Sequence, residues 1–118
     1  MNRDEILLTI PGKPEYISTI RLTTSSIASK MGLDIDSIED LRVAISEACN
    51  IVMGKQNIKI EYTIEESGLS IKVSSEDRID YKNDQSMELG KQILNTLVDE
   101  VEFTDDYIMI KKYIGDRQ

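Results

Sequence analysis

Two polar side chains, Glu47 and Asn50, lie within an otherwise apolar stretch of the chain. They are three residues apart, so a helix would place them side by side on its surface. A carboxylate and an amide at the edge of a buried stripe need hydrogen-bond partners or a chemical task. One interpretation is structural, with Asn50 capping the helix end and Glu47 facing water. The other interpretation is that the pair belongs to a functional site.

The composition limits what chemistry such a site can perform. The 118 residues include no histidine and a single cysteine, Cys49. The lack of histidine excludes histidine acid–base catalysis, Ser–His nucleophiles and histidine metal ligands. Cys49 lies on the apolar side of the same stretch, which is typical of a small core residue and not of a nucleophile. No cysteine pair or carboxylate cluster has the ligand spacing of a zinc or calcium site.

Charge and hydropathy limit the partners. The formal net charge is −8 and the Lys and Arg residues are scattered, which argues against direct nucleic-acid binding. No apolar run is long enough to span a bilayer, so we expect no membrane partner. The single cysteine rules out a disulfide framework, and together these features favour a cytoplasmic protein.

The element that positions Glu47 and Asn50 is a predicted amphipathic helix. Its start is indicated by Asp36 with Glu39 three residues later, and its end by Gly54. The apolar positions recur at three- and four-residue steps, which predicts one buried face, with Ile45 between the helix and a sheet. These positions are Ile38, Leu41, Ile45, Ala48, Cys49 and Val52.

The remaining chain contains two further helical patterns and five strand patterns, joined by a polar, irregular segment over 77–85. The helices are expected from Pro14 to Gly32 and from Met87 to Val98, and the strands at 6–10, 58–64, 69–73, 101–103 and 107–114. Residues 1–118 therefore form one domain. We predict an α+β two-layer sandwich, with three helices on one face of a mixed, mostly antiparallel sheet.

Three segments resemble one known family, the anti-sigma-factor serine kinases of the RsbW type, which have the GHKL, histidine-kinase-like ATPase fold. Ser46-Glu-Ala-Cys-Asn50 resembles the N-box of that family. The stretch from Ile10 to Thr23 is similar to the start of the family, and the stretch from Gln92 to Glu102 to its last helix and strand. The resemblance covers nearly the whole chain and implies the same fold.

The resemblance implies an Mg-ATP site in which Glu47 is the catalytic carboxylate. The family holds magnesium with an asparagine four residues after this glutamate. Here that position is Ile51, while Asn50 stands one residue earlier and is rotated about 100° around the helix. Isoleucine cannot bind magnesium, which requires oxygen ligands.

The other two nucleotide boxes also depart from the family. Asp77 or Glu76 matches the adenine-binding aspartate, but no glycine follows. The phosphate-binding glycines align with Glu88 and Gly90, and Glu88 would repel a phosphate by about 1–4 kcal/mol. The family's lid is reduced to roughly 78–86. We therefore expect remnants at Glu47, Asn50, Asp77 and Gly90, no resident cofactor, and a decayed nucleotide site.

The family's partner surface is better preserved than its nucleotide boxes. Members of the family dimerise and bind a sigma factor through the first helix, where Arg21 matches the contacting arginine. Glu15 and Tyr16 precede it in the matching segment. The first hypothesis is a homodimeric protein that binds a sigma factor or an anti-anti-sigma factor. The alternatives are an ATP-dependent serine kinase acting on that antagonist, with Mg-ATP as cofactor, and a dimer with an unrelated partner.

Overall fold

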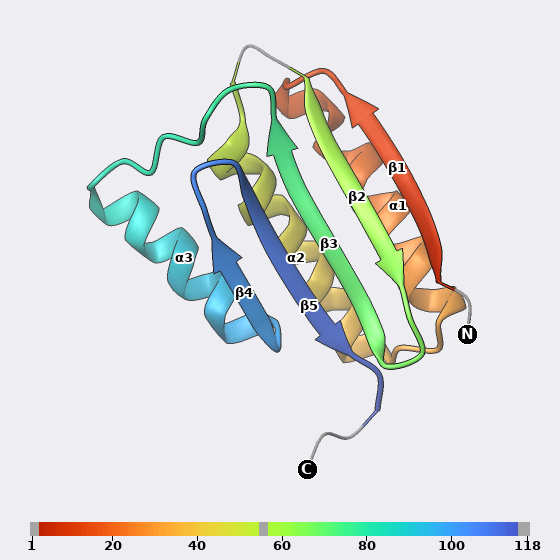
Figure 1. Ribbon diagram of the computed structural model, residues 1–118. Helices are drawn as coiled ribbons and strands as arrows, with labels where there is room; N and C mark the ends of the chain where they lie inside the picture. The colour runs from red at the N-terminus through yellow and green to blue at the C-terminus, as the bar shows by residue number, and fades with distance from the viewer. Residues whose placement is uncertain (1–2, 55–56, 116–118) are drawn as a thin grey trace.

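The computed structural model describes residues 3–54 and 57–115, which form an α+β sandwich of two layers (Figure 1). The strands are β1 Asp4–Ile10, β2 Ile58–Ile64, β3 Gly68–Ser75, β4 Glu100–Phe103 and β5 Tyr107–Tyr113. The helices are α1 Ile17–Lys30, α2 Ile35–Val52 and α3 Gln85–Leu97, with a short 3-10 turn, Pro14–Tyr16, before α1. In Figure 1, α1 and α2 lie behind the sheet and α3 lies beside β4, packed on α2; this arrangement of helices and strands confirms the predicted fold class.

The five strands form one open sheet in the order β1-β2-β3-β5-β4. All four pairings are antiparallel, which agrees with the mostly antiparallel sheet expected from the sequence, but the expected mixture is wrong, because the described strands form no parallel pair. Strand β3 is central, and its Ile71 pairs with Tyr62 of β2 on one side and Ile110 of β5 on the other. The predicted alternation along 58–64 is confirmed, because Ile58, Ile60 and Tyr62 are buried, while Ile64 at the end of the strand is partly buried.

The core lies between α2 and the sheet. Ile45 is 0% exposed, as the periodicity predicts. Cys49 is also buried, and burial raises the pKa of its thiol to about 12, so the thiol stays protonated and behaves as a core residue. The one buried polar pair in this region is satisfied, because the hydroxyl oxygens of Thr24 and Tyr62 are 2.7 Å apart.

The helix ends were only partly predictable. Gly32 ends α1 as expected, with a φ of +88°. The N–H groups of Gly32 and Leu33 donate to the carbonyls of Ser29 and Ala28, which is a Schellman motif. The predicted cap at Asp36 is wrong. Because the buried Leu33 closes the motif, the chain enters α2 earlier, and the Asp34 carboxylate accepts the N–H of Ser37 at 2.8 Å. That hydrogen bond lowers the pKa of Asp34.

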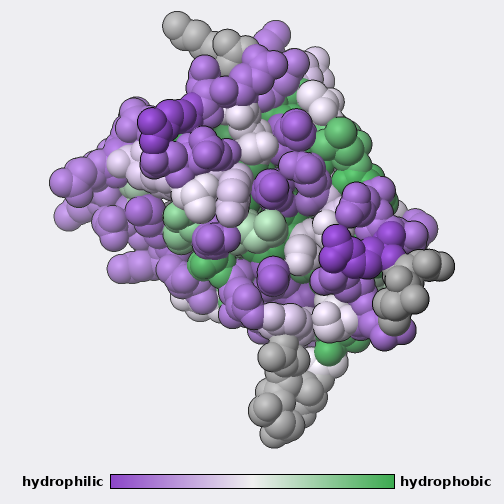
Figure 2. All heavy atoms as spheres, in the orientation of Figure 1, coloured by the Kyte–Doolittle hydropathy of each residue, from purple (hydrophilic) through white to green (hydrophobic). Residues whose placement is uncertain are grey.

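Figure 2 shows the sheet face that is not covered by helices, and most of it is hydrophilic. Apolar residues gather over β1 at the edge of the sheet, where Ile6 is 39% exposed and Leu7 is 62% exposed. Within the described residues, no helix is both long enough and apolar enough to cross a membrane.

Candidate functional site

Four elements meet at one end of the molecule: the last turn of α2, the end of β3, the segment 76–84 and the start of α3. Two adjoining cavities lie between them, of about 340 Å³ and about 300 Å³. Both cavities are lined by Asn50, Ile51, Lys82 and Met87. Their combined size is within the range of small-molecule pockets, about 300–1,000 Å³.

The candidate residues from the sequence divide between these cavities. Asp77 and Asn50 line the larger cavity. Glu47, Asn50 and Gly90 line the smaller one. Residues that are up to 43 positions apart along the chain, Glu47 and Gly90, are therefore brought to one place by the packing of α3 on α2.

The contact between α2 and α3 decides which side chains face the smaller cavity. A Cβ atom added to Gly90 would lie 3.4 Å from Oε1 of Glu47 and 3.8 Å from Cδ1 of Ile51. Glu47 and Ile51, four residues apart, thus share the face of α2 that packs on α3. Helix α2 is regular through Val52, so Asn50 lies about 100° around the helix from Ile51, where it is exposed and borders both cavities.

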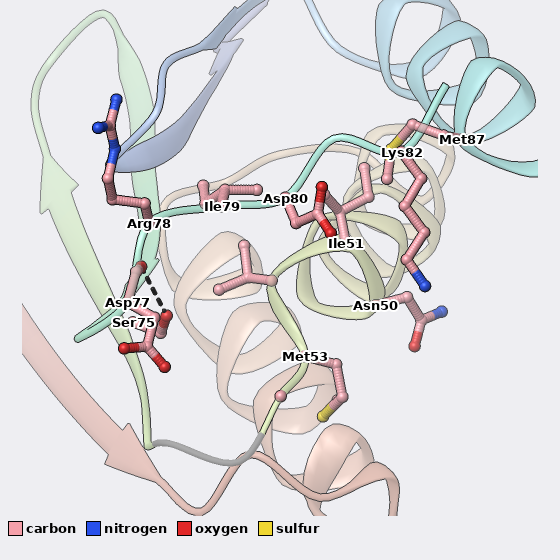
Figure 3. A pocket seen from close by; sticks show the side chains of 12 residues that line it. Asn50, Ile51, Met53, Ser75, Asp77, Arg78, Ile79, Asp80, Lys82 and Met87 are labelled. Atoms are coloured by element: carbon pink, nitrogen blue, oxygen red, sulfur yellow. Dashed lines mark hydrogen bonds between the residues drawn. The ribbon is translucent and has the colours of Figure 1, made fainter. Parts of the chain in front are cut away.

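Figure 3 shows how the larger cavity is arranged. The side chains of Asn50 and Lys82 lie together on one side, and Asp77 lies on the opposite side, beside Ser75. The hydroxyl of Ser75 donates to the backbone carbonyl of Asp77 at 3.1 Å, and the Asp77 side chain is exposed.

The N-terminus of α3 is closed by the protein's own groups. The Asp84 carboxylate accepts the N–H of Met87 at 2.8 Å, and the Asp84 carbonyl accepts the N–H of Glu88 at 3.1 Å. Gly90 is the sixth residue of the helix and is buried. It therefore allows close packing on α2 and does not belong to a free loop at the helix start.

The charges around the two cavities are mainly negative. Four carboxylates, those of Glu47, Asp77, Asp80 and Asp84, line them, against the cations of Arg78 and Lys82. The Arg78 side chain forms an ion pair with Asp105 on the β4–β5 turn, so its charge is already compensated. Lys82 is the cation that lines both cavities.

The proposed partner residues lie at a different place, on the first helix and the turn before it. Glu15 and Arg21 are exposed, and Tyr16 is half-buried against the core. Leu22, next to Arg21, is 68% exposed. The sequence interpretation did not single out Leu22, although it falls outside the apolar stripe formed by Ile17, Ile20, Thr24, Ile27 and Met31.

Lys82 and Asp84 were also not singled out from the sequence. Asp84 had a local signal, because an aspartate three residues before the first apolar helical position is a typical N-cap. The third helix was expected to begin at Met87 and begins at Gln85, directly after this cap. Lys82 had no local signal, since only the fold brings it beside Asn50.

The fold and this end of the sheet define a class of protein. A model of the histidine kinase-like ATPase domain matches residues 10–111. The chain belongs to this family, and its relatives identify the RsbW type within it.

Two curated relatives are named as the serine-protein kinase RsbW. One, from Bacillus cereus, is 30% identical to this chain, and the alignment covers 98% of this chain and 88% of the relative. A second, from another Bacillus cereus strain, is 31% identical with the same coverage. Each match extends over 141 residues although this chain has 118, so the relatives carry residues in the matched region that this chain lacks.

A solved structure supports the fold. The RsbU and RsbW domains of Rv1364c from Mycobacterium tuberculosis superpose with a TM-score of 0.66 at 14% identity over 94% of this chain. This chain spans about a third, 32%, of that longer chain.

Proposed function

We propose that this protein is an anti-sigma-factor-like regulator that binds a sigma factor or its antagonist, and that its nucleotide site has decayed. The family match over residues 10–111 supports the first part. The observation that carries the second part is the closed N-terminus of α3, where the Asp84 carboxylate takes the N–H of Met87.

The residues at the two cavities do not fit Mg-ATP. A helix N-terminus binds phosphate through its free N–H groups and positive dipole end. Here Asp84 accepts one of these groups, and Glu88 adds a second negative charge to the first turn. Ile51 faces α3 in the position where an amide would hold magnesium, and the amide of Asn50 is exposed and lies beside Lys82 instead. A carboxylate therefore already takes the role of the phosphate.

The shortness of the chain supports the same proposal. Only residues 76–84 join β3 to α3, and the relatives carry additional residues within the matched region. We propose that the missing residues include the family's lid over the nucleotide. Glu47, Asn50, Asp77 and Gly90 are then remnants that persist for packing or because nothing selects against them.

Partner binding is proposed for the first helix. Glu15, Tyr16 and Arg21 correspond to the family's partner-binding segment, and the exposed Leu22 adds an apolar anchor beside Arg21. An interface combines such apolar anchors with arginine contacts to carboxylates and carbonyls. We propose a homodimer as well, because β1 is an edge strand with Ile6 and Leu7 exposed. Multi-angle light scattering would test the dimer, and a monomer at all concentrations would contradict it.

Arg21→Ala should weaken binding of the partner by about 1–3 kcal/mol, the usual cost of losing a charged hydrogen bond at an interface. The measurement is a titration with the sigma factor or antagonist recovered from the native cell extract. Arg42→Ala is the matched control, because Arg42 pairs with Glu39 on α2. Unchanged affinity of Arg21→Ala would locate the partner surface elsewhere, with the hairpin from Val101 to Ile114 as the next candidate.

Calorimetry with Mg-ATP separates this function from the alternative, an ATP-dependent serine kinase acting on an anti-anti-sigma factor. The two cavities around Asn50 favour the alternative, since they retain the position of a ligand site. We expect no tight binding, because no amide faces the metal position and a carboxylate caps the helix. A low-micromolar dissociation constant would restore the kinase and Mg-ATP as its cofactor.

A further inference from the structure

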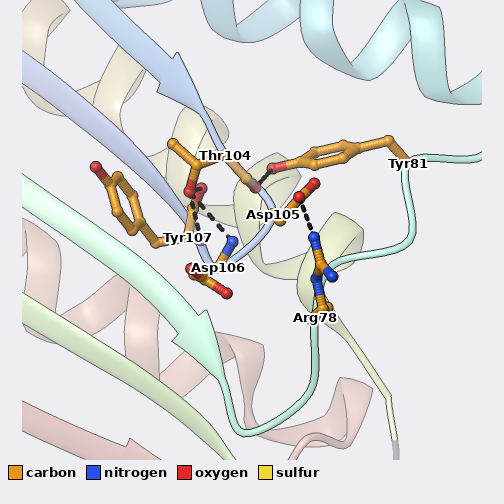
Figure 4. Close-up of polar contacts among 6 residues, drawn as sticks. All are labelled: Arg78, Tyr81, Thr104, Asp105, Asp106 and Tyr107. Atoms are coloured by element: carbon orange, nitrogen blue, oxygen red, sulfur yellow. Dashed lines mark hydrogen bonds and ion pairs between the residues drawn. The ribbon is translucent and has the colours of Figure 1, made fainter.

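The segment 76–84, which borders the larger cavity, packs against the β4–β5 turn (Figure 4). The N–H of Ile79 donates to the carbonyl of Asp105 at 2.7 Å. The hydroxyl of Tyr81 donates to the carbonyl of Thr104 at 2.6 Å. Arg78 forms an ion pair with the Asp105 carboxylate. Three anchor points, at Arg78, Ile79 and Tyr81, thus join the segment to two residues of the turn.

Apolar packing adds to these polar contacts. Ile79 is 9% exposed and belongs to the core. The ring of Tyr81 packs edge-to-face against Phe103 of β4, with centroids 6.0 Å apart. The Lys91 ammonium of α3 lies 4.9 Å from the centroid of Tyr81 and 5.4 Å from that of Phe103. Such ring and cation contacts are attractive beyond the burial of apolar area. The anchor therefore includes β4, the turn and α3.

The turn that receives the segment is itself well ordered by hydrogen bonds. The Thr104 N–H donates to the Tyr107 carbonyl at 2.9 Å, and the Thr104 hydroxyl oxygen accepts the N–H groups of Asp106 at 3.2 Å and Tyr107 at 3.0 Å. A turn with this many internal bonds presents its carbonyls in a fixed geometry. The segment consequently docks on a preformed part of the sheet.

The contacts differ in how strongly they hold the segment on the turn. The Arg78–Asp105 pair is exposed, with side chains 75% and 63% accessible, so it contributes little. The hydrogen bond of the Tyr81 hydroxyl is half-buried. Burial, together with the nearby Asp105 carboxylate, raises the pKa of Tyr81 to about 12. The hydroxyl therefore remains a donor in neutral solution. Ile79 and Tyr81 therefore hold the segment, and Arg78 adds a minor contact.

We propose that residues 76–84 form a latched strap, a conformational device in which the β4–β5 turn, and not a bound ligand, sets the wall of the larger cavity. Arg78, Ile79, Asp80 and Lys82 of the strap line that cavity, so the latch determines its shape. The latch stands on these contacts alone. Its consequence rests on the proposed function: partner binding by this protein does not respond to nucleotide.

The test is amide hydrogen exchange at Ile79 in the full-length protein, with the Val73 amide of β3 as internal reference. In the unaltered protein Ile79 should exchange far more slowly than a free peptide, because its N–H is bonded to the turn. Tyr81→Ala should accelerate Ile79 about tenfold, since it removes a hydrogen bond and the ring packing. Tyr81→Phe should have a smaller effect and Arg78→Ala the smallest, with Val73 unchanged in all three.

Two control variants carry the same chemical changes without removing a contact of the strap. Tyr107→Phe removes a hydroxyl that donates to the Glu102 side chain at 3.3 Å and leaves the backbone bonds of the turn in place, and Arg42→Ala breaks the exposed pair with Glu39. Neither should accelerate Ile79. Exchange of Ile79 at the free-peptide rate in the unaltered protein would overturn the latch. So would equal acceleration of Ile79 and Val73 in Tyr81→Ala, which would make Tyr81 a contributor to the whole domain.

A second arm repeats the exchange measurement with Mg-ATP. We expect no change in the protection of Ile79 or Lys82. A change would overturn the latch, because a ligand would then set the position of the strap. If Mg-ATP abolished partner binding while the strap stayed unchanged, the result would count against the proposed function alone. Failure of the latch and failure of the proposed function are therefore distinguishable.

Discussion

The two sides of α2 have kept different parts of the family pattern. On the sheet side, Ile45, Ala48 and Cys49 are completely buried and follow the expected spacing. On the cavity side, we propose that Ile51 stands where the family has a magnesium ligand, while Asn50 beside it is exposed. The sheet side needs only apolar side chains of suitable volume, which many sequences satisfy. The cavity side would need particular oxygen atoms at particular places, and one shifted residue removes them.

The starts of α2 and α3 extend this comparison. Each begins with an aspartate that accepts the N–H of the third following residue at 2.8 Å: Asp34 with Ser37, and Asp84 with Met87. The first cap lies where α1 turns into α2. The second lies at the cavity, at the helix end where a phosphate would bind in the family. The same local device is therefore purely structural in one place and, under the proposed function, excludes a ligand in the other.

The largest expected effect contrasts the two sides of α2 directly. Ile45→Ala should lower the free energy of unfolding by about 2–5 kcal/mol, because it leaves a cavity in a closed core. Glu47→Ala should cost far less if Glu47 is a remnant at the cavity edge. Urea melts of both variants provide the measurement, with Val43→Ala, at a site 46% exposed on the same helix, as control. A larger loss for Glu47→Ala would reveal a structural partner of this carboxylate.

An intermediate effect is expected at the two caps. Asp34→Ala and Asp84→Ala should each lower the free energy of unfolding by about 1 kcal/mol, since each frees one helix N–H. Asp34→Asn and Asp84→Asn should retain most of the stability, because asparagine also caps. Thermal or urea unfolding measures all four variants. A loss at Asp84 well above that at Asp34 would show that Asp84 also holds the strap or α3 in place.

The smallest effect is expected at Gly90. Alanine is favoured over glycine inside a helix by about 0.8–1.0 kcal/mol. The added Cβ would lie 3.4 Å from the flexible end of Glu47, which can move slightly. Gly90→Ala should therefore leave the free energy of unfolding unchanged or raise it by less than about 1 kcal/mol. A clear loss of stability would mean that the contact between α2 and α3 cannot adjust, and that packing alone requires the glycine.

The sequence predicted the elements well where local periodicity was strong. The buried faces of α1 and α2 and the alternation in β2 agree with the structure, because burial against a flat sheet imposes these periods. The start of α2 was misplaced, because Asp34 and Asp36 both suit a cap. Only the closure of α1 by Gly32 and Leu33 selects Asp34, and that closure depends on the burial of Leu33.

The candidate site was predictable in its members and less so in its geometry. Motif matching identified Glu47, Asn50, Asp77 and Gly90, and all four line the two cavities. It did not identify Lys82, which reaches the site from an irregular segment without periodicity. The sequence also left open whether Asn50 is rotated away or the helix is shifted. The regular course of α2 through Val52 decides for rotation.

By itself the sequence determined the class of fold, the order of its elements, the buried faces of α1 and α2 and the family, because these depend on composition and on patterns between near neighbours. Tertiary structure alone decided that Gly90 packs on Glu47, that Lys82 lies beside Asn50, and that the strap is held by the β4–β5 turn. These contacts join residues from separate elements, such as Tyr81 and Thr104. They form only after the sheet has brought the elements together, and no local pattern encodes which carbonyl a distant hydroxyl will meet.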